Sequence, residues 1–131
     1  MFRSRTWRPE RKDHRSQRRG IRRIITLMIV MSVLYPKTTE SRFDVDYYVR
    51  THIPLVTSRW SAMGLQNVDL LQGASSLDGG APTYEVMGQL TFESQESLEK
   101  ALTQYGNEIL SDIPNFTNVQ PIIQTGKVLP I

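Results

Sequence analysis

Residues 43–56 read Phe43-Asp-Val-Asp-Tyr-Tyr-Val-Arg-Thr-His-Ile-Pro-Leu-Val56, and they predict the helix around which the rest of the chain is arranged. Asp44 is a predicted N-cap, because its carboxylate can accept a hydrogen bond from the first turn, and Asp46 adds favourable negative charge there. The residues that follow at spacings of three and four predict one stripe of an amphipathic helix: Val45, Tyr48, Val49, His52, Val56, Trp60 and Met63. Gly64 suits the left-handed position that follows a helix end.

Pro54 lies inside this predicted helix. Proline has no backbone N–H, so it should leave the carbonyl of Arg50 without its helical partner. We therefore expect a kink or a short break in the helix near this position.

Four further segments have strand-like patterns. Residues 29–35 are apolar at nearly every position, which is typical of a central strand covered on both faces. Residues 65–73 predict a second strand, and residues 84–92 alternate clearly enough to predict a third. Residues 119–128 predict a last strand, which Pro121 places at or near an edge of the sheet because proline cannot donate to a neighbour.

A second helix is predicted between the third and fourth strands. Ser94 can cap its first turn, which also contains Glu96. Its buried stripe is expected to contain Leu98, Ala101, Leu102, Tyr105 and Ile109. Gly88, in the middle of the preceding strand, is expected to leave room above the sheet because it has no side chain.

The order of these elements is β-α-β-β-α-β, which predicts a ferredoxin-like α+β fold. Right-handed connections place both helices on one face of a four-stranded antiparallel sheet. The other face would be left bare, although the strand at 29–35 offers apolar residues to it, and a small monomer rarely exposes such a face. We therefore predict that two sheets stack face to face in a two-fold dimer.

Composition divides the chain into two parts. Its 131 residues suit one domain, and the absence of cysteine excludes disulfides, thiolate metal sites and a cysteine nucleophile. A reducing compartment, the cytoplasm, fits this composition. Residues 1–27 carry ten Lys and Arg against two Asp and Glu, a formal charge of +8, whereas residues 28–131 carry six against eleven, a formal charge of −5. We predict a basic extension at 1–27 and a domain at 28–131.

The basic extension has too few apolar residues to offset the entropy of ordering, so it is predicted to be disordered. It could be an arm for nucleic acid or anionic membrane, a signal peptide with residues 24–34 as its apolar region, or translated upstream sequence before a start at Met28 or Met31. No small-residue cleavage site follows the apolar run, and the run is too short to span a membrane. We favour a mis-assigned start, and expect no nucleic-acid partner for the domain and no membrane span.

Four segments resemble the EthD family, which is named for ethyl tert-butyl ether degradation: Met28-Ile-Val-Met-Ser-Val-Leu-Tyr-Pro36, Phe43-Asp-Val-Asp-Tyr-Tyr48, His52-Ile-Pro-Leu-Val56 and Asp112-Ile-Pro-Asn-Phe-Thr117. The resemblance covers about residues 28–129. It implies a dimeric α+β barrel with a cavity between each sheet and its helices. It also implies a part in the oxidative breakdown of small organic compounds, often labelled oxidoreductase. Relatives on this barrel include muconolactone isomerases, fungal polyketide dehydratases and cofactor-free monooxygenases.

His52 is the leading catalytic candidate, because a neutral imidazole can take or give a proton at neutral pH. Tyr48 lies four residues earlier on the same helix face and could hydrogen-bond a carbonyl or quinone oxygen. Alternatively, His52 is a core histidine bonded to a carbonyl that Pro54 frees, and Tyr48 simply packs its ring.

Residues on the same stripe are expected to contact the substrate: Val56, Trp60 and Met63, with Tyr47 beside them, although Tyr47 points about 100° away from Tyr48. Trp60 as plain core is the alternative. Asp44 and Asp46 could act as paired carboxylates, but capping explains them better.

Cofactor motifs are lacking. The sequence contains no Gly-x-Gly-x-x-Gly for a dinucleotide, no phosphate-binding loop and no pair of histidines at metal spacing. We therefore expect no metal and no cofactor, with His52 as a haem ligand kept as a minor alternative.

Together these observations predict a dimer that binds a small apolar or aromatic carbonyl compound and carries out cofactor-free oxidation, isomerisation or dehydration, with His52 as acid and base. The competing hypothesis is a carrier or accessory protein beside a catabolic oxygenase.

Overall fold

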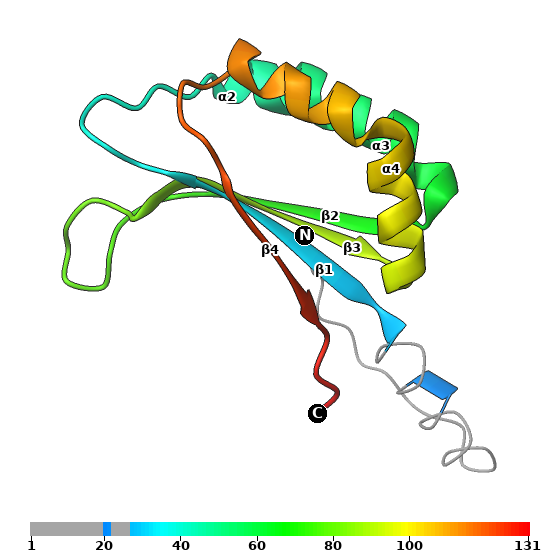
Figure 1. Ribbon diagram of the computed structural model, residues 1–131. Helices are drawn as coiled ribbons and strands as arrows, with labels where there is room; N and C mark the ends of the chain where they lie inside the picture. Colours follow the sequence, from blue (N-terminus) through cyan, green and yellow to red (C-terminus); the bar gives the residue numbers. More distant parts are fainter. Residues whose placement is uncertain (1–19, 22–26) are drawn as a thin grey trace.

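The computed structural model describes residues 20–21 and 27–131. Its four strands form one antiparallel sheet in the order β2-β3-β1-β4. Figure 1 shows the helices on one face of this sheet, which confirms the predicted ferredoxin-like α+β fold. The strands are β1 (Ile29–Pro36), β2 (Leu65–Gln72), β3 (Tyr84–Phe92) and β4 (Ile122–Lys127).

The position of each strand follows from its sequence. β1 is central, between β3 and β4, as its continuous apolar run predicts. β4 is an edge strand, as predicted from Pro121, but it is shorter than expected because pairing with β1 begins at Ile122. Proline has no N–H to donate, which explains why the ladder starts only after it.

The first helical segment is continuous in space but changes its winding three times. The carboxylate of Asp44 accepts a hydrogen bond from the backbone N–H of Tyr47 at 3.0 Å, which confirms the predicted cap. Gly64 ends the segment at φ 99°, the left-handed conformation expected there. The four parts are α2 (Val45–Tyr47), the π-helical turn η1 (Tyr48–His52), α3 (Ile53–Trp60) and the 3-10 turn η2 (Ser61–Met63).

The break that Pro54 predicts is observed as the π turn η1. The backbone N–H of Ile53 bonds to the carbonyl of Tyr48, five residues earlier. This turn ends at His52, two residues before Pro54, close to where the regular pattern of bonds must end. An α-helical stripe does not continue unchanged across such a turn. Val49, predicted to be buried, is therefore 49% exposed.

The helix α4 (Gln95–Asp112) covers the other half of the sheet and is followed by the 3-10 turn η3 (Ile113–Asn115). Ser94 caps it, since its Oγ accepts from the backbone N–H of Ser97 at 3.1 Å. Most of the predicted stripe faces the sheet, with Leu98, Ala101 and Ile109 buried and Tyr105 half-buried. Leu102 is 38% exposed, contrary to prediction, because it lies at the rim of the cavity described below.

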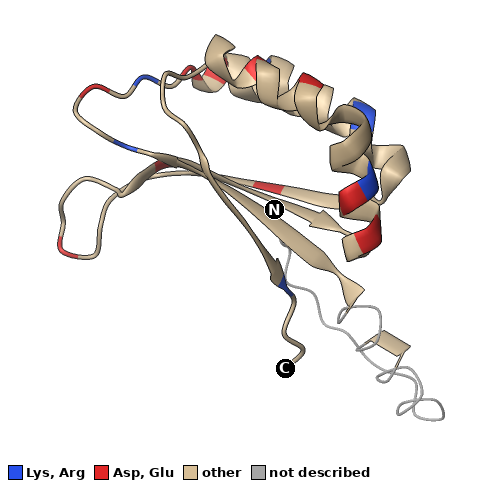
Figure 2. Ribbon diagram, viewed as in Figure 1, with Lys and Arg blue, Asp and Glu red and all other residues tan. Residues whose placement is uncertain are grey.

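Charged residues lie mainly on the helices and loops, whereas β1 carries none (Figure 2). No helix in the part of the chain that the structure describes is both long and apolar enough to cross a membrane. The predicted basic extension, residues 1–27, falls outside the described residues except for 20–21 and 27.

Candidate functional site

A cavity of ≈ 260 Å³ lies between the sheet and the helices. Residues of two buried clusters meet in its wall, one around Trp60 and Phe92 and the other around Tyr35 and Phe116. Its rim includes three partly exposed apolar residues, Leu102 and Leu110 from α4 and Ile123 from β4. The remaining lining residues are Met31, Val33, Tyr35, Tyr48, His52, Ile53, Val56, Trp60, Leu90, Ile109 and Ile113.

His52 is the polar residue of this lining that can titrate near neutral pH. It is the last residue of η1 and is 3% exposed. Its Nδ1 lies 2.9 Å from Oδ2 of Asp112, the last residue of α4. This contact joins the ends of two helical segments that are 60 residues apart in sequence. The partner of Nδ1 is thus a carboxylate, and not the backbone carbonyl freed by Pro54 that the alternative predicts.

Asp112 is held by three donors. Its Oδ1 accepts from the hydroxyl of Tyr47 at 2.7 Å and from the amide of Asn115 at 2.9 Å, while Oδ2 faces His52. Burial alone would raise the pKa of Asp112, but the hydrogen bonds from Asn115, His52 and Tyr47 outweigh it and hold this pKa below its ordinary value. Asp112 is therefore a carboxylate at neutral pH.

His52 is neutral at the same pH. Burial lowers its pKa, and the hydrogen bond and negative charge of Asp112 oppose this only in part. Since the Asp112 carboxylate can only accept, the hydrogen-bond network assigns the imidazole proton to Nδ1. Nε2 then carries a lone pair and has no hydrogen-bond partner among residues 20–21 and 27–131. A neutral imidazole in this tautomer can accept a proton at Nε2.

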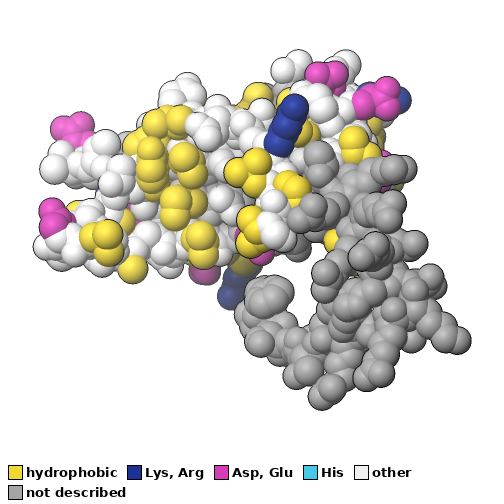
Figure 3. Space-filling view, turned by 90° about the horizontal axis from the view of Figure 1, so that it is seen from below, with side chains coloured by type: hydrophobic (Ala, Val, Ile, Leu, Met, Phe, Trp, Pro, Cys, Tyr) yellow, Lys and Arg dark blue, Asp and Glu magenta, His cyan; other side chains and the backbone are white. Residues whose placement is uncertain are grey.

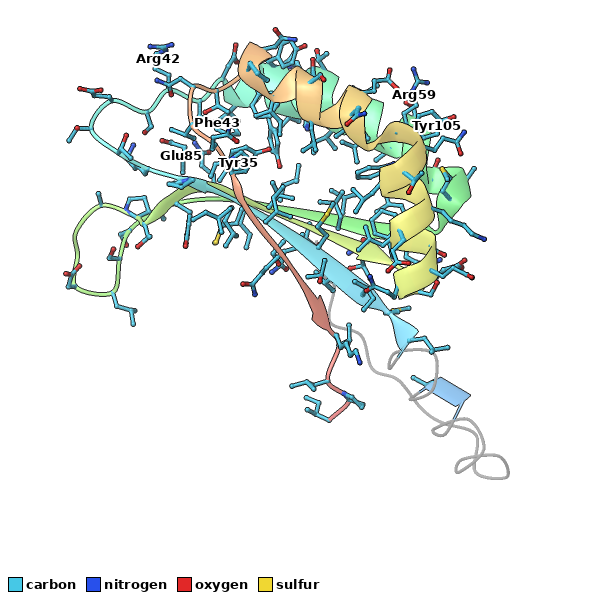
Figure 4. All side chains as sticks on the ribbon, in the orientation of Figure 1. Tyr35, Arg42, Phe43, Arg59, Glu85 and Tyr105 are labelled. Carbon is cyan, nitrogen blue, oxygen red and sulfur yellow. The ribbon has the colours of Figure 1, made fainter. Side chains whose placement is uncertain are left out.

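Aromatic rings fix the imidazole plane. The ring of Tyr48 stacks on His52 with centroids 5.7 Å apart and an interplanar angle of 16°. Phe116 contacts the imidazole at 4.6 Å between centroids. Tyr35 and Phe43 extend the cluster, with centroids 5.0 Å apart in an edge-on arrangement (Figure 4). His52 is thus held by packing as well as by Asp112.

Two phenol hydroxyls, those of Tyr35 and Tyr48, are buried beside the cavity without a hydrogen-bond partner among the described residues. Tyr35 is 1% exposed and Tyr48 is 3% exposed, and neither hydroxyl has a hydrogen-bond partner in the described ranges 20–21 and 27–131. Burial raises the pKa of Tyr48 to about 12. Burial, and secondarily the neighbouring Tyr48, raises the pKa of Tyr35 above its ordinary range. Both phenols stay protonated at neutral pH.

Gly88 makes the position of the Tyr48 hydroxyl possible. A Cβ at Gly88 would lie 2.8 Å from the Tyr48 oxygen, closer than such atoms approach. The room that the sequence predicts above Gly88 is therefore occupied by this hydroxyl.

Four of the six predicted site residues line the cavity. His52, Tyr48, Val56 and Trp60 line the cavity, and the Trp60 indole also donates to the carbonyl of Ala101 at 3.0 Å. The remaining two candidates do not line it: Met63 packs at the edge of the core in η2, and Tyr47 turns its hydroxyl to Asp112.

Asp112, Tyr35 and Phe116 are site residues that the sequence interpretation did not assign. Asp112 and Phe116 belong to the segment 112–117, which was recognised as part of the family pattern without a role for either side chain. Tyr35 is the next-to-last residue of β1, a strand whose prediction rests on its apolar pattern alone. Residues 20–21 and 27–131 contain no cluster of three or more metal-ligating side chains.

Solved structures with this architecture are known. The chain is similar to an EthD-like protein from Ralstonia eutropha, with 32% identity, a TM-score of 0.74, and coverage of 80% of this chain and 95% of that chain. It is also similar to an ethyl tert-butyl ether (EthD) family protein from Bacillus halodurans, with 21% identity, a TM-score of 0.64, and coverage of 79% and 100% respectively. No protein-family model and no curated protein matches the chain. The second likeness, at the lower identity, bears on the fold alone.

Proposed function

Since the chain belongs to the EthD family, we propose that it binds a small, mostly apolar carbonyl compound in the cavity and transfers a proton at one of its carbons. His52 is the general base, and Asp112 is a positioning residue that holds its tautomer. The observation that carries the proposal is the 2.9 Å contact between these two residues at the wall of an apolar cavity.

The arrangement suits removal of a proton from carbon. Nε2 of His52 is the one basic atom of the lining that is neutral and unpaired near neutral pH, within the part of the chain that the structure describes. Positioned bases of this kind contribute about 10²–10⁴-fold to a rate. Loss of a proton next to a carbonyl is the first step shared by isomerisation, dehydration and the reaction of a carbanion with an oxidant. The proposal assigns this step alone to the chain's own residues.

The proposed chemistry needs no cofactor. The cavity of ≈ 260 Å³ is below the roughly 300–1,000 Å³ of sites for drug-sized ligands, and a haem is larger than those ligands. The residues as placed therefore do not suit a haem on His52. A part in the oxidative breakdown of organic compounds stays a prediction from the family, and a cytoplasmic location stays a prediction from the composition.

Exchange of the carbonyl-adjacent protons of β-tetralone for solvent deuterium, followed by NMR, tests the base. We expect the protein to accelerate exchange above the buffer rate and His52→Gln to lower this acceleration by about 10²–10⁴-fold. His14→Gln is a matched control because it replaces the other histidine of the chain. Equal exchange by His52→Gln and the parent protein would refute the role of His52.

A carrier without turnover is the second candidate. It is favoured by the apolar character of the lining, which offers binding surface but only one group that titrates near neutral pH. Binding of β-tetralone, seen as a ligand-dependent rise in Tm, with no acceleration of exchange by the parent protein would select the carrier over the enzyme.

We also propose a two-fold dimer that covers the outer face of the sheet. Four apolar residues, one from each strand, form a row across this face: Leu71 is paired with Met87, Met87 with Leu34, and Leu34 with Ile122. Their side chains alternate with those that line the cavity, so they point away from the helices. Figure 3 shows hydrophobic side chains gathered on this face. An exposed row of this kind is typical of a surface that a second copy covers.

A further inference from the structure

We propose that the hydroxyls of Tyr35 and Tyr48 bind the carbonyl oxygen of the ligand, which makes that ligand an uncharged, enolisable ketone or aldehyde. This inference rests on the proposed function, since it names the substrate class of the same cavity. It adds a second tyrosine, from β1, to the one on η1.

The two hydroxyls are the unsatisfied polar groups of the cavity wall. Both side chains are more than nine-tenths buried, both line the cavity, and neither hydroxyl has a hydrogen-bond partner in residues 20–21 and 27–131. A buried hydroxyl without a partner costs about 1–3 kcal/mol, and native structures satisfy nearly all such groups. A phenylalanine in either place would pack as well and leave nothing unsatisfied. The hydroxyls are explained when a ligand oxygen accepts from them.

The two tyrosines come from different layers and converge. Tyr35 projects from the sheet toward the helices, as Figure 4 shows, and Tyr48 projects from the helical layer to Gly88 on β3. Their rings meet edge-on with centroids 5.9 Å apart. Both rings line the cavity and touch each other, so the proposal assigns their two hydroxyls to one ligand oxygen.

The donors select an uncharged oxygen acceptor. Phenols that remain protonated donate hydrogen bonds, and no Lys or Arg among the described residues lines the cavity to neutralise a carboxylate or phosphate. A carbonyl oxygen accepts two hydrogen bonds without needing a counter-ion. The volume corresponds to roughly nine waters at about 30 Å³ each, enough for a ligand on the order of ten non-hydrogen atoms.

The oxygen site lies beside the base, because Tyr48 stacks directly on His52. In the proposed step, Nε2 of His52 takes the proton from the carbon next to the carbonyl. The C–H electron pair forms a C=C bond, and the carbonyl π pair moves to the oxygen, which becomes an enolate. The tyrosine hydroxyls stabilise the negative charge that develops there. Return of a proton from His52 to the carbon that lost it lets the oxygen electron pair re-form the C=O bond and restores the carbonyl compound, so no oxidant is needed.

Paired ligands test the oxygen site separately from catalysis. β-Tetralone and tetralin share one shape, but only the first has a carbonyl. We expect the parent protein to bind β-tetralone on the order of tenfold more tightly than tetralin, measured by titration calorimetry. Tyr35→Phe and Tyr48→Phe each remove only a hydroxyl, so each should reduce this preference by about three- to tenfold while the Kd for tetralin stays within about twofold.

Folding controls are available. Removing an unpartnered hydroxyl should leave Tm unchanged or raise it. Tyr105→Phe removes a hydroxyl that accepts from Gln104 at 3.3 Å and does not line the cavity, so it should keep the parent preference. An unchanged preference in either Tyr35→Phe or Tyr48→Phe would overturn the two-donor site.

The outcomes separate this inference from the proposed function. A carbonyl preference that falls in both tyrosine variants, without proton exchange by the parent protein, keeps the oxygen site and removes the catalytic role of His52. Exchange that depends on His52, with a preference unaffected by the tyrosine variants, keeps the base and removes the oxygen site.

Discussion

Replacing Asp112 with asparagine should switch the tautomer of His52. In the native site, Oδ1 of Asp112 accepts two hydrogen bonds, from Tyr47 at 2.7 Å and Asn115 at 2.9 Å, whereas Oδ2 accepts one, from His52 at 2.9 Å. An asparagine has only one oxygen. That oxygen is better placed where two donors point, so the amide NH₂ should face Nδ1 of His52.

This orientation removes the base. Nδ1 would then accept from the amide, and the imidazole proton would move to Nε2, the atom that must take the substrate proton. We expect the exchange rate of Asp112→Asn to fall by about 10²–10⁴-fold, the full contribution of a positioned base. All three hydrogen bonds can persist, although without the carboxylate charge, so the free energy of unfolding should fall by only about 1–3 kcal/mol.

Two measurements decide this prediction. Proton exchange of β-tetralone gives the rate, and the nitrogen chemical shifts of the His52 imidazole report which nitrogen carries the proton. Asp46→Asn is the matched control, because this side chain is 86% exposed and makes only a surface contact with Arg50 at 3.8 Å. Retention of the parent rate by Asp112→Asn, or a proton still on Nδ1, would refute the reasoning.

Three further changes have defined outcomes. Because burial lowers the pKa of His52, the unfolded chain binds more protons below its unfolded pKa of about 6.5. The free energy of unfolding should thus fall as pH drops from about 7.5 to about 5.5, and urea unfolding should show a smaller fall for His52→Gln. Met87→Lys places a charge in the apolar row and should give a monomer in light scattering, whereas Thr103→Lys on the exposed side of α4 should not; a dimeric Met87→Lys would contradict the proposed interface. Gly88→Ala should destabilise the protein by about 1–3 kcal/mol by displacing the Tyr48 hydroxyl, and Tyr48→Phe should restore most of this loss; additive losses in the double variant would contradict that contact.

The fold could be predicted from periodicity because each element buries one face. The alternation of β3 and the apolar run of β1 define their place in the sheet, and Ser94, Asp44 and Gly64 mark helix boundaries by local hydrogen bonding or backbone conformation. These signals act over a few residues, so a single sequence contains them.

The site could be predicted only where it lies on one element. His52 and Tyr48 share a helix face, so their proximity follows from spacing. Asp112 is 60 residues from His52, and no local pattern indicates that the ends of η1 and α4 meet. The direction of the Tyr47 hydroxyl depends on that same long-range contact. The exposure of Val49 follows from the π turn, which a regular helical period does not anticipate.

The π turn divides the first helical segment into two parts with independent rotational phase. Tyr47 of α2 and Tyr48 pack into the cluster that contains Phe116. Val56 and Trp60 of α3 pack instead into the cluster that lies on the sheet. The one surplus residue in η1 allows the segment to pack into both clusters at the same time. Deletion of Thr51, an exposed residue of this turn, would remove the surplus residue and rotate one part against the other by about 100°. The resulting chain would lose the alignment of Val56 and Trp60 with the sheet while Tyr48 keeps its own, so a more regular helix would be a poorer scaffold for this cavity.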